Sequence, residues 1–471
     1  MAALSQHPTS PPPTAPVREK TRHLLLRGWC IVVLFMALSG VAWVNAIGET
    51  AAAVLTVAVS VTSVVLWLVI RPAVNWRRLP WFPVAYIVWA GLSVFWSHWP
   101  VTSLVTWALM VLTTVQGLFV AAVLTWRELV RAIASALKWC LGLSLLLELG
   151  VVLFVHGPIL PGFVVPAHPA DDPIVYWVRG NLFNGGRIQG IQGNANLLAA
   201  VCLLAIIVFA IRIAAKAPRR VLLVGWIVLA AFLMVRASSA TVYLSAVFVA
   251  VVLGTVLLMR TARRPGSRTV YYALYAVVGL GGAATAWLLR DHIFSVLGRS
   301  ADLTGRERIW QAVLARSAEH PVTGWGFATP WLTSDPNFDG WIIDHEQSVA
   351  QAHNMWIDVS MQLGAVGVVL LALLYLAFIW RAWFFAVDRP RWDLRADRPY
   401  SPLTLLPTLV AGMLVVQGMA ESEPLLMWGW MFVVMLAFKI KQAPLVGVGP
   451  IEQRVAIERG ELVPDEDGAR A

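Results

Sequence analysis

The residue best suited to acid–base chemistry lies where a long polar stretch meets an apolar run. His353 begins the predicted span at 353–380, and Asn354, a candidate substrate-binding residue, follows it. A histidine titrates near neutral pH and can take a proton from a hydroxyl group as that oxygen attacks carbon. The alternative is a structural or interfacial histidine. His345 and Glu346 could join His353 around a metal ion, but their spacing matches no standard ligand pattern, so we predict no metal site.

Eight basic side chains are expected on the outer side of the membrane, and all eight are arginines. They are Arg179, Arg187, Arg236, Arg290, Arg299, Arg306, Arg308 and Arg316. Guanidinium groups bind phosphate oxygens through paired hydrogen bonds, which suits a diphosphate substrate better than a lysine ammonium group does. The alternative is that these arginines form salt bridges with carboxylates at the rim.

Two of these arginines are next to predicted spans. Arg187 lies in the glycine-rich run NGGRIQGIQGNANLLAA, where backbone can approach a ligand closely and where Asn196 follows. Arg236 lies in LMVRASSATVYL, close to the apolar phase, where an unpaired arginine is costly and is therefore a functional candidate. The alternatives are interfacial snorkelling for Arg187 and an ordinary tight turn after Arg236.

Arg306 and Arg308 share a predicted short helix after Gly305. Two residues correspond to about 200° around a helix axis, so the two arginines cannot both face one ligand. Arg306 shares its face with Ile309 and Trp310, and we favour it over Arg308.

The remaining candidates are aromatic and acidic. Trp325, in the predicted turn PVTGWGF, either stacks on sugar rings or pins the loop to the membrane interface. Glu421 and Glu423 lie between two predicted spans and are candidates for orienting an arginine or the acceptor. Their alternative is a water-exposed turn.

The composition indicates which elements must position these residues. Apolar residues make up 59% and charged residues 13% of the chain, with a mean hydropathy of +0.71. A chain of 471 residues with these values is a polytopic membrane protein. The net charge of +10 is therefore interpreted through membrane topology, and we expect no nucleic-acid partner. The three cysteines lie in apolar runs, and we predict no disulfide.

Apolar stretches long enough to cross the hydrocarbon core predict an all-α membrane domain of about 12 spans. They cover approximately 29–47, 51–70, 81–98, 103–126, 130–155, 191–212, 220–237, 240–259, 270–289, 353–380, 402–421 and 424–440. With this threading, the tails, the cytoplasmic loops and Lys138, which lies within the fifth span, hold all but eight of the 36 Lys and Arg residues. Both termini are therefore expected in the cytoplasm, and the long outer loops carry the site.

The expected domain organisation follows from these spans. Residues 1–27 form a disordered cytoplasmic tail, residues 28–442 form the membrane domain, and residues 443–471 form a second cytoplasmic tail. The long outer loops are 156–190 and 290–352, with a helical domain in the second.

Several motifs together resemble a known family, the O-antigen ligases and related O-antigen polymerases, which are bacterial glycosyltransferases of the C type. The motifs are WSHWP with the following Ser103, the loop of Arg187, Arg236 before a serine-rich turn, GRERIW at 305–310, HPVTGWGF at 320–327 and HNMWIDVSMQLGAVG at 353–367. Val235 and Gln362 depart from the family, which usually has serine and glutamate there.

The resemblance implies transfer of a glycan from an undecaprenyl-diphosphate carrier to the hydroxyl group of a glycan or lipid acceptor, on the outer face of the bacterial plasma membrane. It implies no metal and no cofactor. Arg187, Arg236 and Arg306 would hold the diphosphate, and His353 would act as base with inversion at the sugar carbon. Ligase and polymerase remain open. A transporter is the alternative from another class, although the spans carry few charges.

Overall fold

The computed structural model describes residues 17–168, 173–261, 267–289, 306–387 and 400–442. Its helices are α1 (Val17–Leu38), α2 (Gly40–Ile47), α3 (Glu49–Ile70), α4 (Trp81–Leu92), α5 (Pro100–Val123), α6 (Trp126–Gly150), α7 (Ala195–Ala214), α8 (Arg220–Ala237), α9 (Ala240–Thr261), α10 (Ser267–Leu288), α12 (Arg306–Glu319), α13 (Met355–Val387), α14 (Leu406–Gly418) and α15 (Met427–Gln442). Two short antiparallel strands, β1 (Ile343–Asp344) and β2 (Gln347–Ser348), form the one hairpin among these residues.

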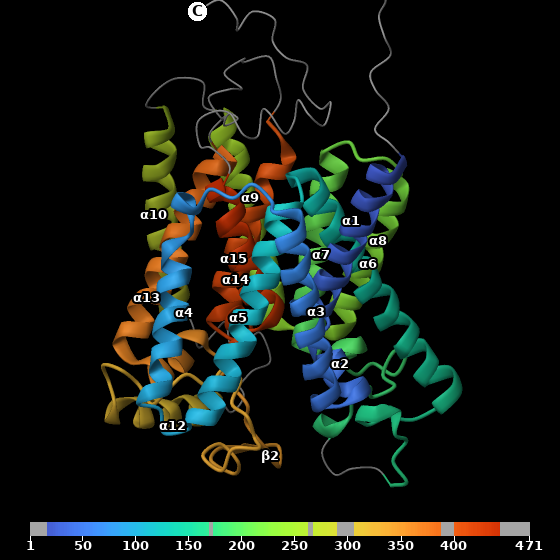
Figure 1. Ribbon diagram of the computed structural model, residues 1–471, viewed down its shortest axis with the longest axis vertical. Helices are drawn as coiled ribbons and strands as arrows, with labels where there is room; N and C mark the ends of the chain where they lie inside the picture. Colours follow the sequence, from blue (N-terminus) through green and yellow to red (C-terminus); the bar gives the residue numbers. More distant parts are fainter. Residues whose placement is uncertain (1–16, 169–172, 262–266, 290–305, 388–399, 443–471) are drawn as a thin grey trace, which may run out of the picture.

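The long helices run side by side as a bundle, and α12 lies across one end of it (Figure 1). The start of α1 and the end of α15 lie at the opposite end. Within the described ranges, eight helices are long and apolar enough to cross a membrane, namely α1, α3, α5, α6 with its π-helical extension to Val155, α7, α8, α9 and α13. The all-α polytopic membrane fold is thereby confirmed.

The expected count of about 12 spans is not reached by these criteria. The other four candidates, α4, α10, α14 and α15, do not satisfy them, although Trp81–Phe95 and Pro402–Gly418 are shorter apolar helices. Helix α15 has 16 residues, below the length of about 20 that a straight crossing needs. The count therefore stays a prediction.

The first span differs from its predicted limits. Helix α1 begins at Val17, so residues 17–27 are helical where we expected tail. A helix can extend beyond its apolar stretch because its backbone hydrogen bonds do not depend on side-chain polarity. After α1 ends at Leu38, the Ser39 hydroxyl donates to the Phe35 carbonyl and α2 starts as a separate helix. The rest of the predicted tails, 1–16 and 443–471, lies outside the described residues, as do 290–305 of the second long loop.

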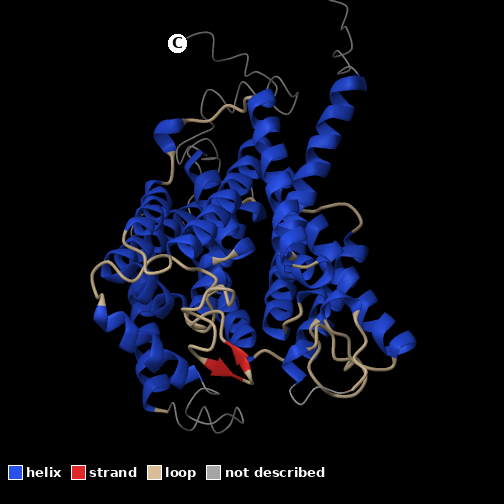
Figure 2. Ribbon diagram, turned by 60° about the horizontal axis from the view of Figure 1, so that its bottom comes forward, coloured by secondary structure: helices blue, strands red, loops and turns tan. Residues whose placement is uncertain are grey.

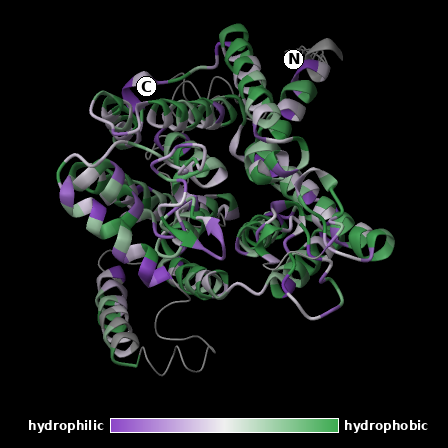
Figure 3. Cartoon of the chain, turned by 90° about the horizontal axis from the view of Figure 1, so that it is seen from below, coloured by the Kyte–Doolittle hydropathy of each residue, from purple (hydrophilic) through white to green (hydrophobic). Residues whose placement is uncertain are grey.

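A small outer domain covers the end of the bundle that α12 crosses. Its core is a separate apolar cluster that includes Ile309 and Val313 from α12, Trp331, Phe338 and Trp99. The hairpin lies among the loops of this domain (Figure 2). Seen from below, hydrophilic segments gather on these loops, whereas the helices at the periphery are mostly hydrophobic (Figure 3).

The outer domain is attached to α13 by backbone contacts at glycines. Gly364 interrupts α13 with φ +60°, and a Cβ added there would lie 2.3 Å from the Val322 carbonyl oxygen. The Trp325 and Gly326 N–H groups donate to the carbonyls of α13 at the same kink. Close backbone packing of this kind requires residues without side chains, which explains the glycines of the HPVTGWGF motif.

Candidate functional site

The centre of the site is the carboxylate of Glu421, in the turn between α14 and α15. The residue is 3% exposed. Its Oε1 accepts a hydrogen bond from Arg306 Nη2 at 2.7 Å, and its Oε2 lies 2.8 Å from His353 Nδ1. Two residues predicted to act together, Arg306 and His353, therefore meet on one acidic side chain.

Helix α12 positions Arg306. Ile309 and Val313 are buried against the outer domain, and the Trp310 indole N–H donates to the Ala352 carbonyl at 2.9 Å. Arg306 begins this helix on the same face and reaches Glu421. The predicted face of α12, with Arg306 beside Ile309 and Trp310, agrees with these contacts.

The backbone before α13 positions His353. Asn354 caps α13, because its side-chain oxygen accepts from the Trp356 and Ile357 N–H groups, and its amide donates to the Met419 carbonyl. His353 has φ +50°, in the left-handed region that costs a non-glycine residue energy. Strain at a residue whose ring contacts Glu421 is typical of a functional site.

Arg187 joins the site through Asn196, near the start of α7. Arg187 Nη2 donates to Asn196 Oδ1 at 2.7 Å, and Asn196 Nδ2 donates to Glu421 Oε1 at 3.0 Å. Arg236 lies next to this loop, where its Nη2 donates to the carbonyls of Asn181 and Gly186. Arg187, Arg306 and His353 thus converge on Glu421, and Arg236 holds the loop that carries Arg187.

Residues 225–372 match the sequence model of a family described as O-antigen ligase. Over this segment, about a third of the chain, the sequence is similar to the O-antigen ligase family. The match runs from α8 into α13 and includes Arg236, Arg306 and His353, so it confirms the resemblance seen in the motifs. No curated protein sequence matches the chain. Together with the eight long apolar helices, the match indicates a multi-pass bacterial membrane protein and supports a glycosyltransferase of the O-antigen ligase or polymerase type.

The site extends beyond the matched segment, since Glu421, Arg187 and Asn196 lie outside it.

The two acidic residues in the turn after α14, Glu421 and Glu423, have pKa values that are shifted in opposite directions. Burial is the largest effect on the pKa of Glu421 and raises it, but the hydrogen bonds and charges of His353 and Arg306 outweigh burial and lower its pKa below the usual glutamate value. Burial, and the nearby Glu421 carboxylate, raise the pKa of Glu423 well above that value.

The surroundings therefore favour the ionised form of Glu421 and the neutral form of Glu423. An ionised carboxylate only accepts hydrogen bonds, so the contact with Glu421 requires the proton of His353 to be on Nδ1. The Nε2 atom then has the lone pair that a base needs. The His353 side chain is 28% exposed, which leaves it open to a substrate.

Behind these residues lies a second polar layer that sequence reasoning did not find. Asp358 is 1% exposed and accepts hydrogen bonds from Ser422, next to Glu421, and from the N–H of Ala352, next to His353. Gln351 lies 3.4 Å from His353 Nδ1 and 3.5 Å from Glu421 Oε2. The position of Asp358 one turn below His353 was visible in the sequence, but no pattern there singles out Gln351.

Two predicted site residues are held elsewhere. Arg308 donates to the Ile343 carbonyl and lies 3.6 Å from Asp344 on the hairpin. The Trp325 ring stacks on the Trp99 ring with 6.1 Å between ring centroids, and its indole N–H donates to the Arg316 carbonyl. No contact among the described residues joins either of them to Glu421. Nor do these residues include any group of three or more His, Cys, Asp or Glu placed to hold a metal ion.

Proposed function

We propose that this protein transfers a glycan from an undecaprenyl-diphosphate carrier to the hydroxyl group of a glycan or lipid acceptor at the outer face of the bacterial plasma membrane. The observation that carries the proposal is that Arg306 and His353 contact the buried carboxylate of Glu421 directly, and that Arg187 is linked to it through Asn196. Two guanidinium groups and one carboxylate leave net positive charge beside a base, which is what a diphosphate leaving group and an attacking hydroxyl require.

In the proposed reaction, His353 Nε2 removes the proton of the acceptor hydroxyl. The hydroxyl oxygen forms a bond to the anomeric carbon while the bond from that carbon to the diphosphate oxygen breaks, so the configuration inverts. The electron pair of the broken bond goes to the diphosphate, whose charge Arg306, Arg187 and Arg236 stabilise. Glu421 holds His353 in the required tautomer, as the aspartate does in a serine-protease triad.

The proposal includes the membrane topology. In it, α4, α10, α14 and α15 complete about 12 crossings with the eight long helices, both termini lie in the cytoplasm, and α12 lies outside. The bundle end that carries α12 is opposite the start of α1 and the end of α15, which agrees with this arrangement (Figure 1).

The test separates the ligase from the polymerase. A strain without this protein accumulates lipid-linked long chains if it lacks a ligase and single lipid-linked repeat units if it lacks a polymerase. His353→Ala should reproduce the deletion phenotype while the variant accumulates in the membrane at the wild-type level. Normal glycan products from that variant would remove His353 from the reaction.

A further inference from the structure

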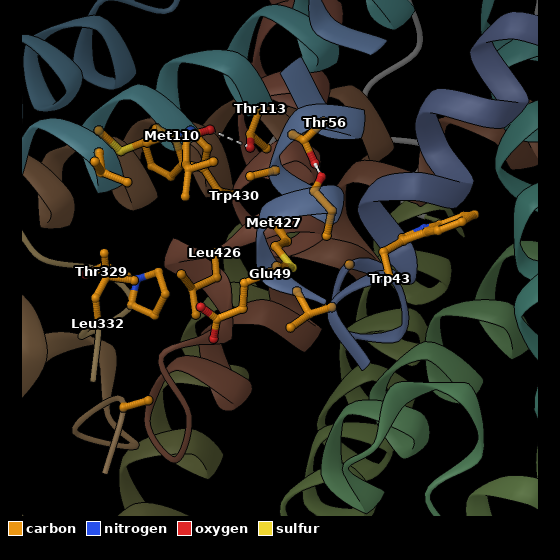
Figure 4. A pocket seen from close by; sticks show the side chains of 18 of the residues that line it. Trp43, Glu49, Thr56, Met110, Thr113, Thr329, Leu332, Leu426, Met427 and Trp430 are labelled. Carbon is orange, nitrogen blue, oxygen red and sulfur yellow. Dashed lines mark hydrogen bonds between the residues drawn. The ribbon is translucent and has the colours of Figure 1, made fainter. Parts of the chain in front are cut away.

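A cavity of about 650 Å³ lies beside the site and outside the contacts described above. Its walls come from the end of α1, from α2, α3 and α5, and from the start of α15, and residues 329–334 of the outer domain border it. Figure 4 shows Thr329 and Leu332 on one side, Trp43 on the opposite side, and Glu49, Leu426 and Met427 between them. The cavity therefore lies where membrane helices meet the outer domain.

The lining suits a hydrocarbon chain. Most of its side chains are apolar, and the polar ones on the helices are mainly threonines. Thr56 and Thr113, for example, donate to carbonyls of their own helices. Ala53, an exposed residue of α3, lines the cavity. A chain entering from the bilayer would bury its methylenes here.

Charge decides which lipid fits. Among the described residues that line the cavity there is no lysine or arginine, and the one charged side chain is the acidic Glu49 at the start of α3. The arginines of the site are on other elements, Arg306 on α12, Arg187 before α7 and Arg236 on α8. An anionic diphosphate is attracted to those arginines and repelled by Glu49. The rim of the cavity thus favours a lipid whose head carries hydroxyl groups without negative charge.

The cavity wall is continuous with the supports of the catalytic groups. The Trp331 ring lines the cavity, and its indole N–H donates to Asp358 at 2.9 Å. Ala350, in the same wall, precedes Gln351, and Leu425 follows Glu423 in the turn that carries Glu421. A chain held here would therefore lie against the residues that support Glu421 and His353.

We propose that this cavity binds the hydrocarbon anchor of the acceptor, and that the acceptor is a lipid with an uncharged, hydroxyl-bearing head. The assignment of this lipid as acceptor rests on the proposed function. The donor carrier then occupies the arginine side of Glu421, and the two substrates approach the same centre from different sides.

The probe for this proposal is a hexadecyl glucoside with a photoreactive diazirine in its alkyl chain, added to the full-length protein in phospholipid vesicles. We expect crosslinks to α3, α5 and residues 425–430, and competition by unlabelled hexadecyl glucoside but not by undecaprenyl diphosphate. Ala53→Trp should weaken labelling about tenfold, because the ring displaces about two methylenes of the chain. Thr113→Phe, from the opposite wall, should also weaken it.

Val54→Trp is the matched control, because Val54 is adjacent on α3, is 64% exposed and does not line the cavity. It should label like the wild type. Displacement of the probe by undecaprenyl diphosphate would assign the cavity to the donor and overturn the proposal, as would equal labelling of Ala53→Trp, Thr113→Phe and wild type. Labelling needs no turnover, so wild-type protein that binds the probe but transfers no glycan would refute the proposed function and leave the hydrocarbon site in place.

Discussion

Replacing Glu421 with glutamine tests whether the buried carboxylate holds the site together. The variant keeps the shape of the side chain but exchanges one accepting oxygen for an NH₂ group that can only donate. Whichever way the amide is turned, it faces a donor, either Arg306 Nη2 or His353 Nδ1, that the carboxylate now satisfies. A hydrogen bond to a charged group contributes about 1.5–3 kcal/mol. If that energy is lost when the imidazole gains its proton, kcat should fall about 10- to 150-fold.

The assay is single-turnover glycan transfer by the purified protein in vesicles at saturating donor and acceptor. Glu423→Gln is the matched control, since Glu423 is two residues away and equally deep in the protein, but its raised pKa keeps it neutral. Glutamine therefore copies its charge, and kcat should stay at the wild-type value. Equal activity of Glu421→Gln and wild type would refute the view that Glu421 orients His353.

Three further predictions follow from the same contacts. Arg306→Ala should abolish transfer, because it removes the contact with Glu421. Arg308→Ala should retain transfer, because it loses only the contacts of an exposed side chain with the hairpin. Transfer assays on membranes with matched protein levels distinguish the two. Gly364→Ala should lower the melting temperature of the detergent-solubilised protein through a cost of more than about 1 kcal/mol, because φ is +60° and the added Cβ meets the Val322 carbonyl; an unchanged melting temperature would show that α13 relaxes there. Glu423→Gln should raise the melting temperature at pH 7. In the unfolded chain Glu423 ionises above its usual pKa of 4.5, whereas burial raises its pKa in the folded protein, so stability is lost as pH rises towards that raised pKa. Glutamine does not ionise and removes this loss. The pKa of Glu421 is lowered, so its contribution has the opposite sign and is lost only as pH falls below 4.5; thermal scans from pH 4 to 8 test both signs.

The sequence allowed the type of fold to be predicted, together with most of the candidate site residues that the structure brings together. Apolar stretches of membrane-spanning length require helices, because backbone groups in lipid must be hydrogen-bonded within their own segment. The choice of Arg306 over Arg308 needed only the angle between neighbouring residues on a helix, and the structure gives them different partners. The end of α1 was predicted less well, since the break at Ser39 lies inside an apolar run that gives no sign of it.

Tertiary structure alone decided how these groups are connected. Glu421 meets His353, Arg306 and Asn196 across 68, 115 and 225 residues of sequence, and no periodicity or motif spans such separations. Glu421 and Glu423 look equivalent in the sequence, yet only Glu421 faces His353 and Arg306, which lower its pKa, whereas burial raises the pKa of Glu423. The sequence determined which residues could react because that depends on side-chain chemistry. Their roles depend on the charge and burial around each group, which arise only when distant segments pack together.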